Sequence, residues 1–140
     1  MNHRLRGLIL LSAFLMFIAC AHLTATPGSQ EALVQKIQME WEAKVKKNWG
    51  VVYDLAVDAY RQKVDRGSFV RRANVNVQEF SIKEVKIIEP RKKALGVVDY
   101  VITQMGFDFR GTAKEEWLWE NGAWHLNLLP TPGPPFGKKK

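Results

Sequence analysis

The sequence predicts an α+β domain in which helices come first and an antiparallel sheet follows. Apolar residues recur at every fourth position between 30 and 49, which is the spacing of one buried face of an amphipathic helix. From residue 74 onward apolar and polar residues alternate, which is the period of a half-buried strand. The pair Asn121-Gly122 stands between two such runs and is the strongest short signal of a β-hairpin. The chain of 140 residues is long enough for one domain, which we place at residues 30–130.

The helical half is predicted to begin with one long, kinked helix. Ser29 suits its N-cap, and Gly50 is expected to mark a kink because the residues after it still suit a helix. Two short helices should follow, one capped by Asp58 and one, residues 66–72, capped by Asp65. The apolar positions that repeat every four residues are Leu33, Ile37, Trp41, Val45 and Trp49.

The strand half is predicted to contain a long central strand. A first run, residues 75–87, slips in phase at Lys83-Glu84, which indicates a β-bulge, and residues 89–93 form a turn. The run Leu95–Met105 is apolar on both faces, so we expect it to be central and covered on both. At Gly106 the chain either turns a corner or continues the strand.

The Asn121-Gly122 turn fixes the register of the last hairpin. A two-residue loop pairs Glu120 with Ala123, Trp119 with Trp124, Leu118 with His125, and Trp117 with Leu126. The three tryptophans then share one face, either in the core or around a cavity for an apolar ligand. Candidate pocket residues are Trp41, Tyr53, Trp117, Trp119 and Trp124.

Residues 1–20 have the features of an export signal. A basic start precedes an apolar run from Leu8 to Cys20 of 13 residues, which is short against the roughly 20 that cross a membrane as a helix. The segment Phe17-Ile18-Ala19-Cys20 resembles the lipobox of bacterial lipoproteins, although Phe17 stands where leucine is preferred. The resemblance implies acylation, for example with palmitate, at Cys20, the sole cysteine. Secretion with cleavage after Ala21 and an uncleaved anchor are the alternatives.

The same resemblance implies that the protein is located in the bacterial cell envelope. Ala21 follows the cysteine where lipoproteins of the inner membrane usually have Asp, so we expect the outer membrane, facing the periplasm. Residues 21–29 are predicted to be a tether and 131–140 a disordered tail rich in Pro, Gly and Lys. The net charge of +7 lies largely in the first segment and the three terminal lysines, so nucleic acid is not an expected partner.

Two segments resemble the nuclear transport factor two-like superfamily. Residues 49–70, "WGVVYDLAVDAYRQKVDRGSFV", are similar to its first part, and residues 115–129, "EEWLWENGAWHLNLL", to its last hairpin. The resemblance covers about residues 31–129 and implies a cone: helices laid across a strongly curved antiparallel sheet with a cavity inside. Members include ketosteroid isomerase, dehydratases, periplasmic domains of secretion machines and many proteins without known activity, so the fold does not choose a function.

The sequence offers few groups for chemistry. It has no metal-ligand spacing, no nucleophile motif and no phosphate loop, so we expect neither metal nor cofactor. Asp99 interrupts the central strand beside Tyr100. A desolvated Asp99 could act as a general base, with Tyr53 or Tyr100 donating to an oxyanion, or it could have a structural role.

We therefore expect a membrane-anchored, non-catalytic envelope lipoprotein. Its anchor would be the acylated Cys20, and its domain would bind a partner protein or a small apolar ligand. Two alternatives are an isomerase- or hydrolase-like enzyme that uses Asp99 and a tyrosine, and an assembly module of a secretion apparatus. A homodimer is also left open.

Overall fold

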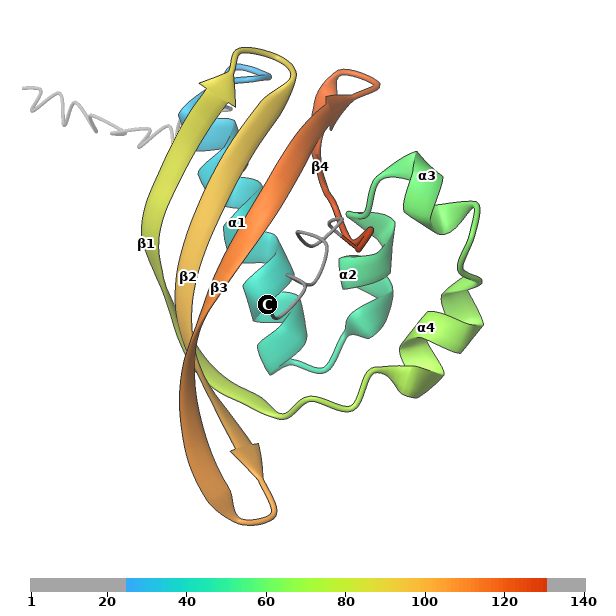
Figure 1. Ribbon diagram of the computed structural model, residues 1–140, viewed down its shortest axis with the longest axis vertical. Coiled ribbons are helices and arrows are strands. Elements are labelled where there is room, and N and C mark those ends of the chain that lie inside the picture. The colour runs from blue at the N-terminus through green and yellow to red at the C-terminus, as the bar shows by residue number, and fades with distance from the viewer. Residues whose placement is uncertain (1–24, 131–140) are drawn as a thin grey trace, which may run out of the picture.

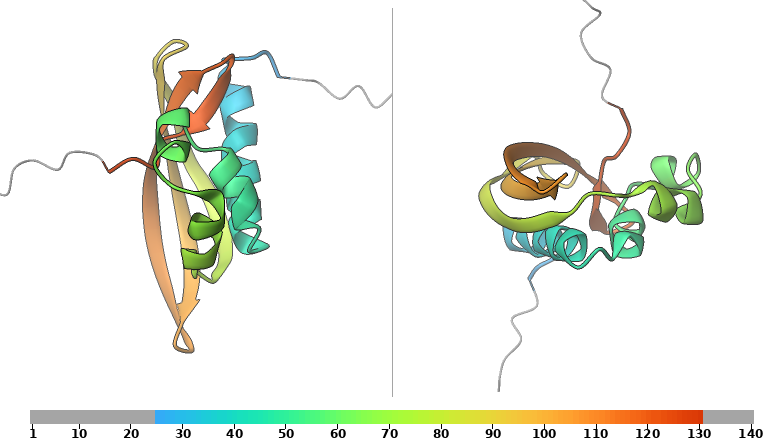
Figure 2. Two further views of the ribbon diagram at one scale, coloured as in Figure 1. Left: turned by 90° about the vertical axis from the view of Figure 1, so that its right-hand side faces the viewer. Right: turned by 90° about the horizontal axis from the view of Figure 1, so that it is seen from below.

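The computed structural model describes residues 25–130, which form helices followed by a four-stranded antiparallel sheet (Figure 1). The strands lie in the order β1-β2-β3-β4; α1 packs across one face of the sheet, and α3 and α4 lie beside its β4 edge (Figure 2). The predicted α+β class is confirmed, and the arrangement is consistent with a cone-like fold. The elements are α1 (Gln30–Val45), α2 (Trp49–Asp54), α3 (Asp58–Arg61), α4 (Arg66–Arg72), β1 (Val77–Glu89), β2 (Lys93–Gln104), β3 (Phe107–Glu120) and β4 (Ala123–Leu126).

The first helical stretch forms two helices and not one kinked helix. Ser29 caps α1 as predicted, accepting a hydrogen bond from the backbone N–H of Ala32 at 3.1 Å. The helix ends before Lys47, whose φ of 57° is left-handed and incompatible with its continuation. Gly50 lies inside α2, where a Cβ would collide with the guanidinium of Arg66. The missing side chain at Gly50 therefore lets the Arg66 guanidinium approach the backbone closely. The helix is interrupted before Gly50, at Lys47.

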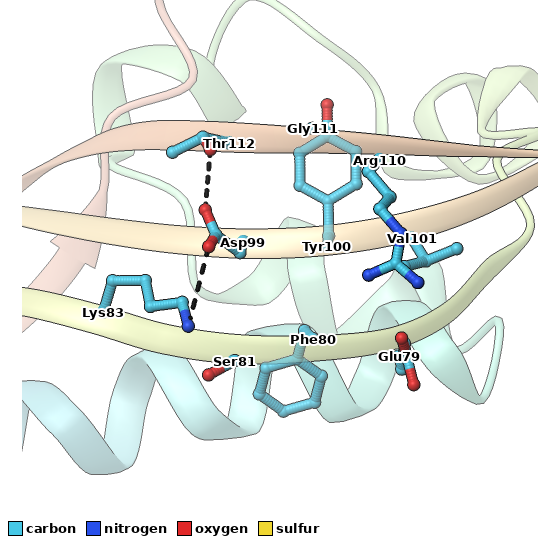
Figure 3. A pocket seen from close by; sticks show the side chains of 10 residues that line it. All are labelled: Glu79, Phe80, Ser81, Lys83, Asp99, Tyr100, Val101, Arg110, Gly111 and Thr112. Carbon is cyan, nitrogen blue, oxygen red and sulfur yellow. Dashed lines mark hydrogen bonds and ion pairs between the residues drawn. The ribbon is translucent and has the colours of Figure 1, made fainter.

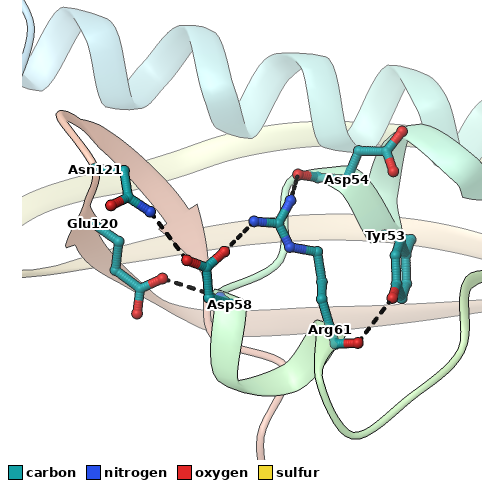
Figure 4. Close-up of polar contacts among 6 residues, drawn as sticks. All are labelled: Tyr53, Asp54, Asp58, Arg61, Glu120 and Asn121. Carbon is teal, nitrogen blue, oxygen red and sulfur yellow. Dashed lines mark hydrogen bonds and ion pairs between the residues drawn. The ribbon is translucent and has the colours of Figure 1, made fainter.

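The two short helices differ in how they begin. Asp65 caps α4 as predicted, because its carboxylate accepts the Ser68 N–H at 2.8 Å. Asp58 does not cap α3 but is its first residue, and its backbone N–H donates to Glu120 on β3 at 3.0 Å. The Asn121 side chain also donates to the Asp58 carboxylate at 3.0 Å (Figure 4). The last hairpin thus holds the start of α3 in place.

The sheet has the predicted bulge and one turn that the sequence left open. The register between β1 and β2 shifts between Ile82 and Glu84, which confirms the bulge. Met105 and Gly106 form a two-residue turn with φ of 52° and 81°, so the chain reverses there and β3 begins. The β2–β3 hairpin projects well beyond the helices (Figure 1).

The two faces of the sheet differ in what covers them. The helix-side face carries Val98 and Trp117, which are fully buried. The opposite face carries Asp99, whose side chain is 46% exposed. The expectation that β2 is central is confirmed, but the expectation that both its faces are covered is wrong, because α1 packs against one face and no helix of residues 25–130 packs on the face that bears Asp99 (Figure 2). We call the side that bears Asp99 the open face.

The last hairpin pairs in the predicted register, residue by residue. Asn121 and Gly122 have φ of 50° and 78°, as a type I′ turn requires. Trp117 and Trp124 are buried in the core, whereas Trp119 is only partly buried. The core cluster consists of Leu33, Ile37, Trp41, Ala43, Val52, Val77, Ala94, Val98, Trp117, Trp124 and Leu126.

The predictions about the ends of the chain fall outside this region. The signal segment, Cys20, tether residues 21–24 and the tail 131–140 lie beyond the described residues. Within residues 25–130, no helix is both long enough and apolar enough to span a membrane.

Candidate functional site

The open face of the sheet contains a pocket of about 460 Å³ (Figure 3). Strands β1, β2 and β3 supply its walls, at a level where Ser81, Asp99 and Thr112 lie side by side. Two carboxylates and two cationic groups line it, so its formal charge is balanced. The lining residues are Glu79, Phe80, Ser81, Lys83, Asp99, Tyr100, Val101, Arg110, Gly111 and Thr112.

Asp99 is the best-connected side chain of this pocket. Its carboxylate accepts a hydrogen bond from the Thr112 hydroxyl at 2.6 Å, and the ammonium of Lys83 lies 3.6 Å away (Figure 3). The side chains of Asp99 and Lys83 are both about half exposed. Asp99 is therefore a solvated, paired carboxylate on a surface, which suits recognition of polar groups better than proton abstraction in a dry cavity.

The structure does not bring Asp99 and the two candidate tyrosines together. Tyr100 follows Asp99 in the strand, so its side chain points to the helix side, where it stacks on Trp41 with ring centroids 5.3 Å apart. Tyr53 is buried on α2, and its hydroxyl donates to the carbonyls of Arg61 and Val64 at 3.1 and 2.8 Å (Figure 4 shows the Arg61 bond). The pairing of a carboxylate with a phenol that isomerase chemistry would need is not formed.

The tryptophans divide between the core and a second pocket. Trp41 and Trp117 belong to the core cluster and fill the space between α1 and the sheet. Trp119 and Trp124 line an apolar pocket of about 300 Å³ beside the segment that leads into α1. Ala25, Pro27, Gly28 and Met39 form part of its other side.

A buried charged cluster on the helix side was missed from the sequence. Glu40 is fully buried, and Lys44, one turn further along α1, contacts its carboxylate. The Lys44 ammonium also donates to Glu115 of β3 at 3.2 Å and lies 3.8 Å from the Trp41 ring centroid. Burial raises the pKa of Glu40 to about 8, with the neighbouring Glu115 carboxylate adding to the rise and Lys44 opposing it. The signal was available: Glu40 follows Ile37 by three residues, on the apolar side of the helix.

The tip of the β2–β3 hairpin carries exposed apolar side chains. Met105 is 90% exposed, Phe107 69% and Phe109 51%. Exposed apolar residues grouped on a projecting element are typical of an interaction surface. Among residues 25–130 no group of three His, Cys, Asp or Glu side chains could hold a metal ion.

Comparison with known proteins shows the fold alone. No protein-family model matches the sequence, and no curated protein matches it either. A SEC-C motif containing protein from Rhodopseudomonas palustris is similar in structure, with a TM-score of 0.57 at 10% identity over 71% of this chain and 77% of that one. A SEC-C motif containing protein from Psychrobacter arcticus gives 0.58 at 8% identity over 79% of this chain, which spans only 64% of that one.

A third solved structure, an NTF-2 like protein of unknown function from Shewanella oneidensis MR-1, is more distant. It has a TM-score of 0.48 at 14% identity over 69% of this chain and 93% of that one. At that level of similarity it bears on none of the arguments below. The chain therefore shares an α+β fold with solved bacterial proteins, and its function has to be argued from its own residues.

Proposed function

We propose that this chain is a lipid-anchored envelope protein that binds a partner protein, without catalysis, at the open face of its sheet. The observation that carries the proposal is the pocket of about 460 Å³ on that face, where Asp99 and Lys83 stand exposed with Thr112 (Figure 3). Paired charges of both signs on an uncovered surface can form hydrogen bonds with a polar partner and fix the orientation in which it binds. A small apolar ligand would cover these charged groups and remove them from water without offering them hydrogen bonds.

The resemblance to the cone-shaped superfamily supports the architecture but not a ligand-filled interior. Trp41 and Trp117 take up the space beneath the sheet, where the family resemblance placed a cavity. The polar pocket lies on the other side of the sheet, which no helix of residues 25–130 covers. A surface contact with another protein needs only this uncovered side.

The anchor is proposed from the sequence. The lipobox-like segment ends at Cys20, five residues before the first described residue, Ala25. Ala25 and Gly28 lie by the turns that join β1 to β2 and β3 to β4. Gly28 approaches Arg91 in the first turn, and Ala25 and Gly28 line a pocket together with Gly122 of the second. These turns are at the opposite end of the sheet from the β2–β3 hairpin (Figure 1). A tether entering there leaves the open face and the hairpin accessible.

Site-specific photo-crosslinking tests the binding surface. A light-reactive residue at exposed Ser81, inside the pocket, should capture one defined protein in cells that make the chain, whereas the same residue at exposed Glu42 on α1 should not. Asp99→Arg should abolish the Ser81 adduct, because it reverses a charge at the centre of the pocket. Equal adducts from both positions, or an adduct that survives Asp99→Arg, would refute the proposal.

Acylation is tested separately. Cys20→Ser should abolish labelling with a radioactive fatty acid and release the protein from the membrane fraction. If labelling persists in Cys20→Ser, the anchor is assigned to the wrong residue.

The apolar pocket beside Trp119 supports a second candidate, binding of a small apolar ligand. Its volume of about 300 Å³ and its tryptophan lining suit a short hydrocarbon chain. Met39→Asp places a charge in this lining and should abolish binding of a fluorescent fatty acid. Val34→Asp, on the same helix but outside the lining, is the control. Equal binding by both variants would exclude this pocket as the ligand site.

A further inference from the structure

Most of β3 forms an open edge of the sheet. The fourth strand pairs with β3 only from Trp117 to Glu120, and one further bond, from the Asn127 N–H to the Glu116 carbonyl at 2.9 Å, extends this contact. Within residues 25–130, no strand pairs with the outer side of residues 107–115. A long open edge offers backbone hydrogen bonds to another strand, and natural proteins usually cover or blunt such edges.

The register shows which backbone groups face outward. The Trp119 N–H donates to the Lys92 carbonyl at 3.0 Å, so residues of odd number on β3 bond to β2. The pairing with β2 has no irregularity over the strand, so this parity holds to its start. The N–H and C=O groups of Asp108, Arg110, Thr112 and Lys114 therefore point to the open edge, and their side chains lie on the open face.

This edge is complementary to itself. When two copies pair antiparallel about Gly111, Asp108 of each copy faces Lys114 of the other, and Arg110 faces Thr112. We propose that β3 joins two copies of this chain through this pairing, which makes one continuous eight-stranded sheet with a two-fold axis at Gly111. The contact is isologous and closes on two copies.

Charge selects this register over its neighbours. A shift that centres the axis on Thr112 places Arg110 opposite Lys114 twice, and a shift that centres it on Arg110 places that residue opposite itself. Like charges directly opposite each other destabilise a strand pair, whereas opposite charges stabilise it. Arg110 and Lys114 have no ion-pair partner among residues 25–130, so both are free to take part.

The residues at the centre of the pairing and the exposed apolar side chains near the β2–β3 hairpin are both compatible with this contact. Gly111 has no side chain, and the Tyr100 phenol lies over it, with its oxygen 2.6 Å from the place of a Cβ. Two glycines at the axis allow the strands to approach without a clash on the helix side. There Phe109 of one copy comes to face the half-buried Ala113 of the other, which covers part of the apolar surface that the single chain exposes.

The second copy and the proposed partner use different surfaces. Pairing takes place in the plane of the sheet, so it leaves the open face of each copy uncovered. The two pockets then lie on the same side of the joined sheet, on either side of the axis, with Arg110 and Thr112 of each at the joint.

A charge exchange tests the pairing. We expect sedimentation equilibrium of the full chain in non-ionic detergent micelles to show a dimer. Lys114→Asp or Asp108→Lys alone should weaken the dimer about tenfold or more, because each turns two attractive contacts into repulsive ones. The double variant carrying both changes should dimerise as the unaltered chain does. Lys83→Asp, on β1, is the matched control and should leave dimerisation unchanged.

Three results would overturn the proposal: a monomer at every concentration, a dimer insensitive to the single charge reversals, or a double variant that fails to recover. Circular dichroism of each variant shows whether it folds, and the exposure of Asp108 and Lys114 indicates that it does. The Ser81 crosslink, measured in the same variants, reports separately on the proposed partner site.

Discussion

The ammonium of Lys44 contacts the carboxylate of Glu40 within the protein, one helical turn away on α1. Glu40 is fully buried, and neither of its oxygens has a hydrogen bond of normal geometry among the described residues. The Lys44 ammonium contacts the carboxylates of both Glu40 and Glu115, so one positive charge lies between two acidic groups. Burying a second negative charge there is costly, and a proton on Glu40 removes that cost.

The first prediction concerns pH. The pKa of Glu40 is raised from 4.5 to about 8 in the folded protein, chiefly by burial. Between these values the folded state holds a proton that the unfolded state releases, so stability falls as the pH rises, by at most about 1.4 kcal/mol per pH unit. Below 4.5 the contribution is fully present. Glu40→Gln should flatten the decline between pH 5 and 8 in urea unfolding, and should be the more stable protein at pH 8.

Glu42→Gln is the control for this measurement. Glu42 lies on the same helix but is half exposed, and it pairs with Lys46 at 3.8 Å. Its replacement should shift stability by less than about 1 kcal/mol and leave the pH slope intact. Carboxyls whose pKa is lowered in the fold behave in the opposite way. Glu116, whose pKa Lys93 lowers, stabilises the folded state above the ordinary glutamate pKa of 4.5, and this stabilisation is lost as the pH falls through the lowered value. A Glu40→Gln protein with an unchanged slope would show that Glu40 is ionised in the fold.

The second prediction compares two tryptophans of the last hairpin. Trp117 is fully buried in the core, whereas Trp119 is partly buried and lines a pocket. Trp117→Ala should lower the free energy of unfolding by about 3–5 kcal/mol, because removing the indole from the core would leave an enclosed cavity. Trp119→Ala should cost clearly less, because the side chain is only partly buried. Equal losses in denaturant titrations would contradict the assigned burial.

Local signals in the sequence identify much of this fold. The N-caps at Ser29 and Asp65 and the register set by Asn121-Gly122 all depend on residues close together in the chain. The bulge after Ile82 is visible as a slip in the alternation. These features are predictable because short-range hydrogen bonds and turn geometry determine them.

Features that depend on distant packing are not identified in this way. Alternation places Asp99 and Tyr100 on opposite faces, but it does not say which face the helices cover. Glu40 is buried because α1 packs on the sheet and on α2 at once, which widens its buried side beyond the four-residue stripe. The open pocket is likewise made by three strands that the sequence cannot bring together by spacing alone.

The third prediction concerns the contact between α1 and β2. A Cβ on Gly96 would lie 2.8 Å from the Cδ1 atom of Ile37, which is closer than real contacts allow. Gly96→Ala should therefore destabilise the protein by about 1–3 kcal/mol. Ile37→Val removes that Cδ1 atom, so the double variant should be more stable than the sum of the single losses predicts. Strict additivity in urea titrations would show that the helix does not approach the strand at Gly96.

The last prediction separates two roles of Asn121. This residue has a φ of 50°, and its side chain donates to Asp58 at 3.0 Å, which links the last hairpin to α3 (Figure 4). Asn121→Gly keeps the turn geometry and loses only an exposed hydrogen bond, so its cost should be about 0.5–1 kcal/mol, further reduced by the ease with which glycine adopts positive φ. Asn121→Ala loses the bond and also strains the backbone, so it should cost about 1 kcal/mol more than Asn121→Gly. Thermal unfolding of both variants measures the difference. Two equally stable variants would contradict the prediction. They would mean that the turn of the alanine variant adopts another geometry without loss of stability.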